Sequence, residues 1–209
     1  MFLDTAVVID FETTGMSPER GDRITEVGLV RLEGGCVTGR YESLVNCGVR
    51  VPTFITAYTG ITQQMVDHAP RVQQVIQEML DFIGNEPLVA HNACFDRRFL
   101  GRECLNVGAR APLGRFLCSL RLARRVYPQF ESHALSAIAR VLDIQYVGSA
   151  HRAMADANVT AQVLLELGRA LKMQYAALHI DVALLREVME MPIKHVPARL
   201  QRRVMSTPT

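Results

Sequence analysis

Residues 7–15 read VVIDFETTG, an apolar and largely β-branched run that ends in two acids and then in turn-forming residues. This composition predicts a buried strand over residues 5–11. Because side chains alternate along a strand, Asp10 and Glu12 share one face, while Phe11 points to the opposite face and into the core. Two carboxylates this close repel each other, and a bound divalent cation would offset that repulsion. On this stretch alone, a solvated strand end whose two acids have no function is the stronger interpretation.

The order of the expected elements favours an α/β fold with a mixed sheet. Further strands are expected over residues 24–32 and 38–46, joined by a turn at EGG, and shorter strands in EPLVAHN and RFLCSL. Thr62 is expected to cap a short helix, Ser132 to cap a later one, and Pro192 to end the last. Amphipathic spacing and end signals predict the longer helices over residues 72–83, 93–107, 120–127, 133–142, 152–172 and 174–191. Strands that come first and then alternate with helices are typical of such a fold.

Composition limits the class of protein. The 209 residues, 49% of them hydrophobic, suffice for one domain with a substantial core, and the net charge of +2 is too small to identify a partner. No apolar run approaches the roughly 18–20 residues of a membrane span, and the N-terminus lacks the features of a signal peptide. The cysteines are odd in number and form no C-x-x-C pair, which disfavours a zinc cluster or a disulfide framework. We therefore expect a cytoplasmic protein with no membrane partner.

Two later stretches place further acids at the starts of predicted helices. In VAHNACFDRRFL, Asp96 falls in the first turn of a helix, where an acid often serves only the helix dipole. In AHRAMADANV, His151 and Asp156 are five residues apart, or about 140° around a helix, so they share a cleft only if His151 precedes the helix. A surface histidine and an ordinary helix-terminal acid are the alternatives. Taken together, the acids occupy a strand end and two helix starts, where an α/β sheet opens its cleft.

These three stretches resemble the motifs of the DEDDh branch of the DnaQ-like exonucleases, a group that includes the proofreading epsilon subunit of bacterial replicase and ribonuclease T. IDFETTG resembles the Asp-x-Glu motif, HNACFD the second motif, and HRAMAD the His-x-x-x-x-Asp motif. The resemblance covers residues 5 to about 170. It implies a ribonuclease H-like fold with a central mixed five-stranded sheet flanked by helices. It also implies an exonuclease domain at residues 1–175, with a C-terminal helix and basic tail at 176–209 that pack on or extend the same domain.

The resemblance implies removal of nucleotides from the 3′ ends of single-stranded DNA and release of nucleoside 5′-monophosphates. Two Mg²⁺ ions, which Mn²⁺ can replace, would be held by Asp10, Glu12, Asp96 and Asp156. Asp10 would contact both ions, Glu12 and Asp156 the ion that carries the attacking water, and Asp96 the other ion. His151 would be the general base, because histidine ordinarily titrates near neutral pH. An exoribonuclease for RNA tails or short oligoribonucleotides, and a non-catalytic polymerase-docking module, are the alternatives.

Substrate contacts are expected at the first two motifs and in VPTFITAYTGITQQMV, which resembles the substrate side of these enzymes. In that segment Phe54 and Thr59 stand where the epsilon subunit has a glutamate and a histidine. Core packing is the alternative for each apolar candidate, and Asn92 either orients the loop before Asp96 or caps the next helix. The expected contacts are Phe11, Thr13, Thr14, Gly15, Phe54, Ile55, Thr59, Asn92 and Phe95, with Tyr58 as a further aromatic candidate.

The C-terminal region and the arginine clusters leave several interpretations open. The helix expected at 174–191 carries an apolar stripe that either completes the core of the domain or docks on a polymerase. The tail after Pro192, with its arginines, is expected to be flexible, and Glu26 is either a buried acid beside the site or half of an ion pair. Besides a nucleic acid 3′ end, a polymerase subunit and a second copy of the chain are the partners considered. Three arginine clusters either contact the phosphates of a nucleic acid or lie on solvated helix faces. They are Arg97 and Arg98; Arg121, Arg124 and Arg125; and Arg199, Arg202 and Arg203.

Overall fold

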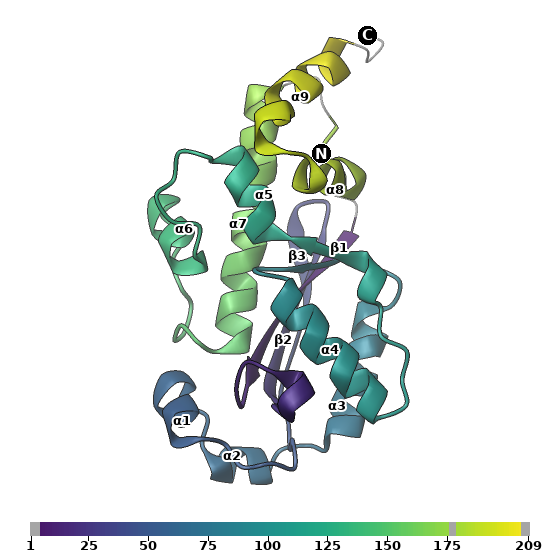
Figure 1. Cartoon of the computed structure of the whole chain (residues 1–209), viewed down its shortest axis with the longest axis vertical. Coiled ribbons are helices and arrows are strands. Elements are labelled where there is room, and N and C mark those ends of the chain that lie inside the picture. Colours follow the sequence, from purple (N-terminus) through teal and green to yellow (C-terminus); the bar gives the residue numbers. More distant parts are fainter. Residues whose placement is uncertain (1–4, 176–178, 206–209) are drawn as a thin grey trace.

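The computed structural model describes residues 5–175 and 179–205, which form a mixed five-stranded sheet with helices on both faces (Figure 1). The sheet order is β3-β2-β1-β4-β5; the β1–β2 and β2–β3 pairs are antiparallel, and the β1–β4 and β4–β5 pairs are parallel. The predicted α/β fold is therefore confirmed. The strands are β1 (Thr5–Thr13), β2 (Ile24–Glu33), β3 (Cys36–Leu44), β4 (Leu88–Ala90) and β5 (Phe116–Cys118).

One long helix covers one face of the sheet, and two others cover the opposite face. Helix α7 packs against β1 and β2, whereas α3 and α4 lie on the other side (Figure 1). The helices are α1 (Thr53–Thr59), α2 (Gln63–Asp67), α3 (Val72–Ile83), α4 (Cys94–Asn106), α5 (Ser119–Val126), α6 (Leu135–Val141), α7 (Ala153–Gln174), α8 (Val182–Glu190) and α9 (Val196–Met205), with 3-10 turns η1 (Pro18–Arg20), η2 (Leu113–Arg115) and η3 (Ile193–His195). Over the described residues, none of these helices has both the length and the apolar character needed to cross a bilayer.

Local sequence signals predicted some helix ends correctly and one wrongly. Thr62 caps α2 as expected, because its hydroxyl accepts the N–H of Met65 at 3.2 Å. The prediction that Ser132 caps the helix at 133 is wrong, since α6 begins at Leu135 with Ala134 at its N-cap. The Ser132 hydroxyl instead accepts the N–H of Ala134 at 3.3 Å, which closes a local turn before the helix.

The C-terminal region differs from the sequence expectation in two ways. The helix expected from residue 174 begins at Val182 as α8, and residues 176–178 lie outside the described part of the chain. The tail expected to be flexible forms η3 and α9 instead. The physical reason is an apolar pair at helical spacing, because Val196 and Leu200 are both buried. On the polar side of α9, Arg199 Nε donates to Glu187 Oε1 of α8 at 2.7 Å.

Helix α8 buries its apolar stripe inside this chain. Leu184, Leu185, Val188 and Met189 belong to the main core, and the helix lies against α5 and β5. The backbone N–H of Cys118, the last residue of β5, donates to the sulfur of Met189 at 3.1 Å. The stripe is thus covered by the domain's own core. Helices α8 and α9 lie at the end of the molecule opposite α1 and α2 (Figure 1).

Candidate active site

Carboxylates from distant parts of the chain meet at the carboxyl end of β1. One oxygen each of Asp10, Glu12 and Asp156 lies within 4.8 Å of the others. Asp156 comes from the first turn of α7. Asp96, in the first turn of α4, is 2% exposed, and its charge raises the pKa of Asp10. All four acids line one cleft of about 760 Å³, so the fold gathers the residues predicted to bind metal.

The start of α7 approaches the sheet closely because β2 carries a glycine at the crossing point. Gly28 pairs with Asp10 in the β1–β2 ladder, so the two residues face the same side of the sheet. A Cβ at Gly28 would lie 2.5 Å from the carbonyl oxygen of Ala153, the first residue of α7. Any side chain at this position would push the helix away from β1.

The next position on the same face of β2 binds the start of α7 directly. Glu26 pairs with Glu12 in the ladder. Its carboxylate accepts the N–H of Ala153 at 2.9 Å and forms an ion pair with Arg152, with 3.0 Å from Arg152 Nε to each carboxylate oxygen. Glu26 is therefore both a buried acid beside the site and half of an ion pair, so the two interpretations left open by the sequence hold together. The contact fixes the first turn of α7, and with it Asp156, over the end of β1.

Replacing Gly28 with alanine is expected to destabilise the protein and weaken its metal binding. The added methyl group meets helix backbone, which cannot turn aside as a side chain can, so α7 must shift. Overpacking of this kind costs about 1–3 kcal/mol, measurable as a lower free energy of unfolding in urea and a smaller rise in Tm on adding Mn²⁺. Gly39→Ala in β3 is the matched control, because its Cβ would lie 3.4 Å from the Phe82 ring. If Gly28→Ala and Gly39→Ala lost equal amounts of unfolding free energy and of the Mn²⁺-induced rise in Tm, the role given to Gly28 would be contradicted.

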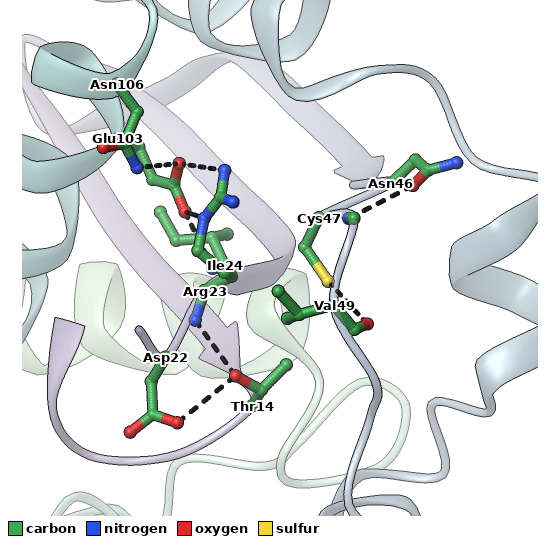
Figure 2. A network of polar contacts seen from close by, with 10 residues as sticks. Thr14, Asp22, Arg23, Ile24, Asn46, Cys47, Val49, Glu103 and Asn106 are labelled. Atoms are coloured by element: carbon green, nitrogen blue, oxygen red, sulfur yellow. Dashed lines mark hydrogen bonds and ion pairs between the residues drawn. The ribbon is translucent and has the colours of Figure 1, made fainter. Parts of the chain in front are cut away.

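A buried ion pair ties α4, the helix that carries Asp96, to the start of β2. Arg23 donates to both carboxylate oxygens of Glu103, at 2.7 and 2.8 Å, and Glu103 is 1% exposed. The N–H of Ile24 and the side-chain amide of Asn106 also donate to Glu103, at 3.3 and 3.4 Å (Figure 2). Such bidentate pairing makes a buried carboxylate tolerable. The pair therefore helps to fix the position of Asp96 relative to β1.

The turn after β1 is held by Asp22. The backbone N–H of Ser17 donates to Asp22 Oδ2 at 2.8 Å. The N–H of Arg23 donates to the Thr14 hydroxyl at 3.0 Å (Figure 2). A Cβ at Gly15 would lie 2.5 Å from the Asp22 carboxylate, so a side chain there would displace the group that holds the turn. Thr14, Gly15 and Asp22 line the cleft. The main chain of this turn thus forms a fixed wall beside the carboxylates.

Burial raises the pKa of each of the four acids predicted to bind metal. It raises the pKa of Asp10 well above its ordinary value, and the charges of Asp96 and Asp156 raise it further. Burial raises the pKa of Glu12 to about 8, with a contribution from the charge of Asp156, and it raises the pKa of Asp96 to about 8. The pKa of Asp156 is also raised, again mainly by burial. Without a cation, the fold therefore favours protonated acids at this site.

The donor set fits a divalent cation. Carboxylate oxygens are the ligands that Mg²⁺ and Mn²⁺ prefer, and three of them are spaced closely enough to share an ion. Neither Asp10 nor Glu12 accepts a hydrogen bond from any residue in the described ranges. Arg152 lowers the pKa of Glu12, but its guanidinium is bound to Glu26. The cleft thus gathers negative charge that the neighbouring side chains leave largely uncompensated.

The metal-free protein is expected to lose stability as the pH rises. A carboxyl whose pKa is higher in the fold than in the unfolded chain favours folding while it is protonated. That contribution is complete below about pH 4 and is lost as the pH rises through the folded value, about 8 for Glu12 and Asp96. With a chelator present, Tm should therefore fall between about pH 5.5 and about pH 9, and added Mg²⁺ should raise it more at the higher pH. A metal-free Tm that increases over this range would contradict the raised pKa values.

Most residues predicted to contact substrate line the cleft, and Asn92 does not. Asn92 is exposed and has φ 66°, a conformation that asparagine tolerates better than most residues. Of the two roles considered for it, the helix cap is wrong, because Ala93 is the N-cap of α4 and no side chain caps it. The predicted residues in the lining are Phe11, Thr13, Thr14, Gly15, Phe54, Ile55, Thr59 and Phe95.

Several residues at the cleft had not been chosen from the sequence: Met16, Asp22, Pro52 and His91 in its lining, and Tyr146 beside it. Met16 and Asp22 belong to the turn after the first motif, and Pro52 lies inside the segment VPTFITAYTGITQQMV, two residues before Phe54, so closer attention to neighbouring positions would have found them. The Tyr146 hydroxyl lowers the pKa of Asp156, which places it next to that carboxylate. No sequence signal marks Tyr146, because its contact depends on the loop before α7.

Two histidines lie at or near the cleft, and their surroundings separate their roles. His91 Nε2 lies 3.0 Å from the carbonyl oxygen of His133, so this nitrogen carries the proton, and Nδ1 then accepts from the Ser119 hydroxyl at 2.9 Å. Burial lowers the pKa of His91 to about 4. His91 is therefore neutral with both nitrogens engaged, which leaves no free position on its ring to accept a proton.

His151 precedes α7, as a shared cleft with Asp156 requires. Its φ is 62°, and its backbone N–H donates to Asp156 Oδ2 at 3.1 Å. The imidazole lies beside the cleft and stacks on Tyr58, which lines it. The reversed backbone at His151 explains how two residues five apart in sequence face the same site.

Some arginines of the three clusters form hydrogen bonds or ion pairs with other residues of this chain. Arg98 donates to Glu19 at 3.0 and 2.5 Å, and Arg125 donates to the carbonyl oxygen of Met191 at 2.7 Å. Arg199, at the end of the molecule opposite α1, is paired with Glu187. Contact of the remaining arginines with phosphates stays a prediction.

Comparison with known proteins agrees with this geometry. The family model RNase_T, described as exonuclease, matches residues 7–164. The chain is 33% identical over 171 residues to the DNA polymerase III subunit epsilon of Aquifex aeolicus, covering 82% of this chain and 84% of that protein. It is 36% identical over 161 residues, 77% of the chain, to the 3′-5′ exonuclease DinG of Bacillus subtilis, but spans only 17% of that protein.

Solved structures show the same fold. The structure of Exonuclease X in complex with 5′ overhanging duplex DNA superposes with a TM-score of 0.64 at 30% identity, over 78% of this chain and 90% of that one. The nuclease domain of 3′hExo, a DEDDh family member bound to rAMP, gives a TM-score of 0.68 at 22% identity over 78% of this chain and 91% of that one. Together with the clustered acids, the family match over residues 7–164 shows that the chain belongs to the RNase_T family of exonucleases.

Proposed function

We propose that this chain is a metal-dependent 3′–5′ exonuclease that acts on single-stranded DNA and releases nucleoside 5′-monophosphates. The observation that carries the proposal is the convergence of Asp10, Glu12 and Asp156, with oxygens within 4.8 Å of one another, in a cleft that also contains Asp96. Four acids far apart in sequence gain nothing by sharing a buried site unless cations offset their repulsion. The family match over residues 7–164 supports the same reaction class.

The four acids would hold two Mg²⁺ ions, and Mn²⁺ would replace them. When bound, such ions supply the charge that stabilises a phosphodiester under attack and make a water molecule more acidic. His151 takes the proton from the attacking water, and His91 is excluded from that role because both of its nitrogens are engaged. Asp156 also accepts the backbone N–H of His151, so the acid and the base belong to one local unit.

The walls of the cleft would hold the last nucleotide. The main chain at Thr14 and Gly15 is fixed by Asp22, which suits close approach to a sugar and phosphate. Phe54 is 66% exposed at the rim and offers a face for a base. Thr59 makes a weaker candidate, because its hydroxyl is buried and donates to the carbonyl oxygen of Ile55.

Relatives support DNA over RNA as the substrate. The epsilon relative is named as a subunit of DNA polymerase III, and Exonuclease X was solved with duplex DNA. A polymerase subunit is accordingly the protein partner we propose, and a second copy of the chain is the next candidate. We also propose that residues 1–175 carry the exonuclease and that 176–209 extend the same domain, a division supported by the packing of α8. A cytoplasmic location fits the five free cysteines.

The proposal is tested with matched DNA and RNA oligonucleotides labelled at either end. With Mg²⁺ or Mn²⁺, a 5′-labelled DNA strand should shorten one nucleotide at a time, and a 3′-labelled strand should release a labelled mononucleotide at once. A chelator should stop both reactions. Faster digestion of RNA would favour the exoribonuclease alternative. Binding without cleavage under any metal would favour the docking module, and cuts within the strand would reject exonuclease action.

A further inference from the structure

The proposed general base is in contact with an aromatic ring from the other side of the cleft. The rings of His151 and Tyr58 are stacked, with centroids 4.0 Å apart and planes inclined by 29°. Tyr58 lies on α1, and His151 lies in the loop before α7. The ring of Tyr58 is close to the acids as well: burial raises the pKa of its hydroxyl, and the charges of Glu12 and Asp156 raise it further.

Apart from this stack, the His151 imidazole has little to hold it. Its ring nitrogens make no hydrogen bond with any side chain or backbone group in residues 5–175 or 179–205. A catalytic base is usually oriented by a third group, most often through a hydrogen bond to the other ring nitrogen. Here the backbone N–H to Asp156 fixes the main chain of His151, and the Tyr58 ring is the contact that fixes its side chain.

Helix α1, which carries Tyr58, is held in place by its own packing and by a side-chain hydrogen bond. Ile55 of this helix packs in a small separate cluster with Cys47, Val51, Ile61 and Val66. The Thr56 hydroxyl donates to the carbonyl oxygen of Ile61 at 2.9 Å, which closes the turn after the helix. The position of Tyr58 is therefore set by α1 and this cluster, independently of the loop that carries His151.

We propose that Tyr58 is a positioning residue that orients the imidazole of His151 for proton transfer. The inference rests on the proposed function, because it assigns Tyr58 to the same reaction. One face of the Tyr58 ring is covered by His151, whereas Phe54, one turn earlier on α1, is exposed and not stacked on it. We therefore assign contact with the nucleobase of the substrate to Phe54, and orientation of the general base His151 to Tyr58.

A double-mutant cycle separates action through His151 from direct action on the substrate. The single variants are Tyr58→Leu, Tyr58→Phe and His151→Asn, and asparagine is chosen because it tolerates the positive φ of His151. Tyr58→Leu should lower kcat about tenfold, the scale of one aromatic pair, with little change in KM. Tyr58→Phe, which keeps the ring, should recover most of that loss. In the His151→Asn background, Tyr58→Leu should have no further effect on kcat.

Phe54→Leu is the matched comparison, because Phe54 lies on the same helix with a similar exposure and lacks the stack. Its effect should fall on KM and should add to that of His151→Asn. Additive losses for Tyr58→Leu and His151→Asn would overturn the proposal, and so would a Tyr58→Phe variant as slow as Tyr58→Leu, since the hydroxyl rather than the ring would then matter.

Proton NMR of the His151 ring tests the stack without activity. Its signals should lie upfield in the unmodified protein because of the Tyr58 ring, and they should return to ordinary values in Tyr58→Leu. If the unmodified protein shows no nuclease activity, the proposed function fails and the positioning role fails with it, whatever the NMR result. If it is active but the ring signals do not move, the proposed function stands and the positioning role is rejected.

Discussion

Replacing Asp10 with asparagine is expected to lower the rate of nucleotide release by about 10³-fold or more and, at the same time, to raise the Tm of the metal-free protein. The loss of activity follows from the position of Asp10 among the clustered oxygens, where an amide cannot supply the negative charge that binds a dication. Removal of a single charge-stabilising group from an active site already costs about 10²–10³ in kcat. The loss for Asp10→Asn should be at least as large, because Asp10 is proposed to contact both ions.

The gain in stability has the same origin. Asp10 is half-buried near Asp96 and Asp156, so near neutral pH the folded state must either hold mutually repelling charges or take up a proton that the unfolded chain releases. Asparagine keeps the shape of the side chain and removes the charge, so the folded state is relieved of an electrostatic cost that the unfolded chain does not carry. For a chain of this size, about 1 kcal/mol corresponds to a change of roughly 2–4 °C in Tm. A rise of a few degrees is therefore expected near neutral pH.

The measurements are initial rates on a labelled oligonucleotide and Tm values with and without Mn²⁺. Asp10→Asn should lose the increase in Tm that Mn²⁺ gives the unmodified protein. Glu33→Gln is the control, because Glu33 is an exposed acid at the far end of β2 and should change neither activity nor stability. An Asp10→Asn variant that digests DNA at the normal rate would remove the basis for the proposed site.

The sequence predicted the local setting of each acid, because strand and helix periodicities are local, whereas the convergence of the acids was implied by the resemblance and by where an α/β sheet opens its cleft. Alternation along a strand places Asp10 and Glu12 on one face, and the structure has both in the cleft. Asp96 and Asp156 lie in the first turns of α4 and α7, as their position after a strand and after the His151 loop indicated. The amphipathic pattern at residues 72–83 likewise gives α3 with its predicted ends.

Contacts between distant segments were beyond such arguments. The close approach of Ala153 to Gly28 explains why β2 has a glycine opposite Asp10, yet nothing near Gly28 in sequence indicates a helix that starts 125 residues later. The same holds for the pair of Arg23 with Glu103. These contacts depend on how the helices pack on the sheet, and a single sequence carries no record of that packing.

Replacing His151 with asparagine is expected to lower kcat by about 10²–10⁴-fold, the range of general acid–base catalysis, while leaving metal binding intact. Asparagine accepts the positive φ at this position and keeps the backbone N–H that donates to Asp156. The asparagine side chain, unlike an imidazole, cannot take a proton from water near neutral pH. The increase in Tm on adding Mn²⁺ should therefore match that of the unmodified protein, although hydrolysis is slow.

This pairing of results separates a base from a metal ligand, because the loss of a ligand would lower both activity and the response to Mn²⁺. His68→Asn is the matched control, since His68 is an exposed histidine at the end of α2 whose ring contacts only the carbonyl oxygen of Gln64 among the residues described. A His151→Asn variant with normal kcat would mean that another group accepts the proton. His91 cannot be that group, because its Nε2 proton is committed to the His133 carbonyl and its Nδ1 to Ser119. The acceptor would then have to be one of the clustered carboxylates.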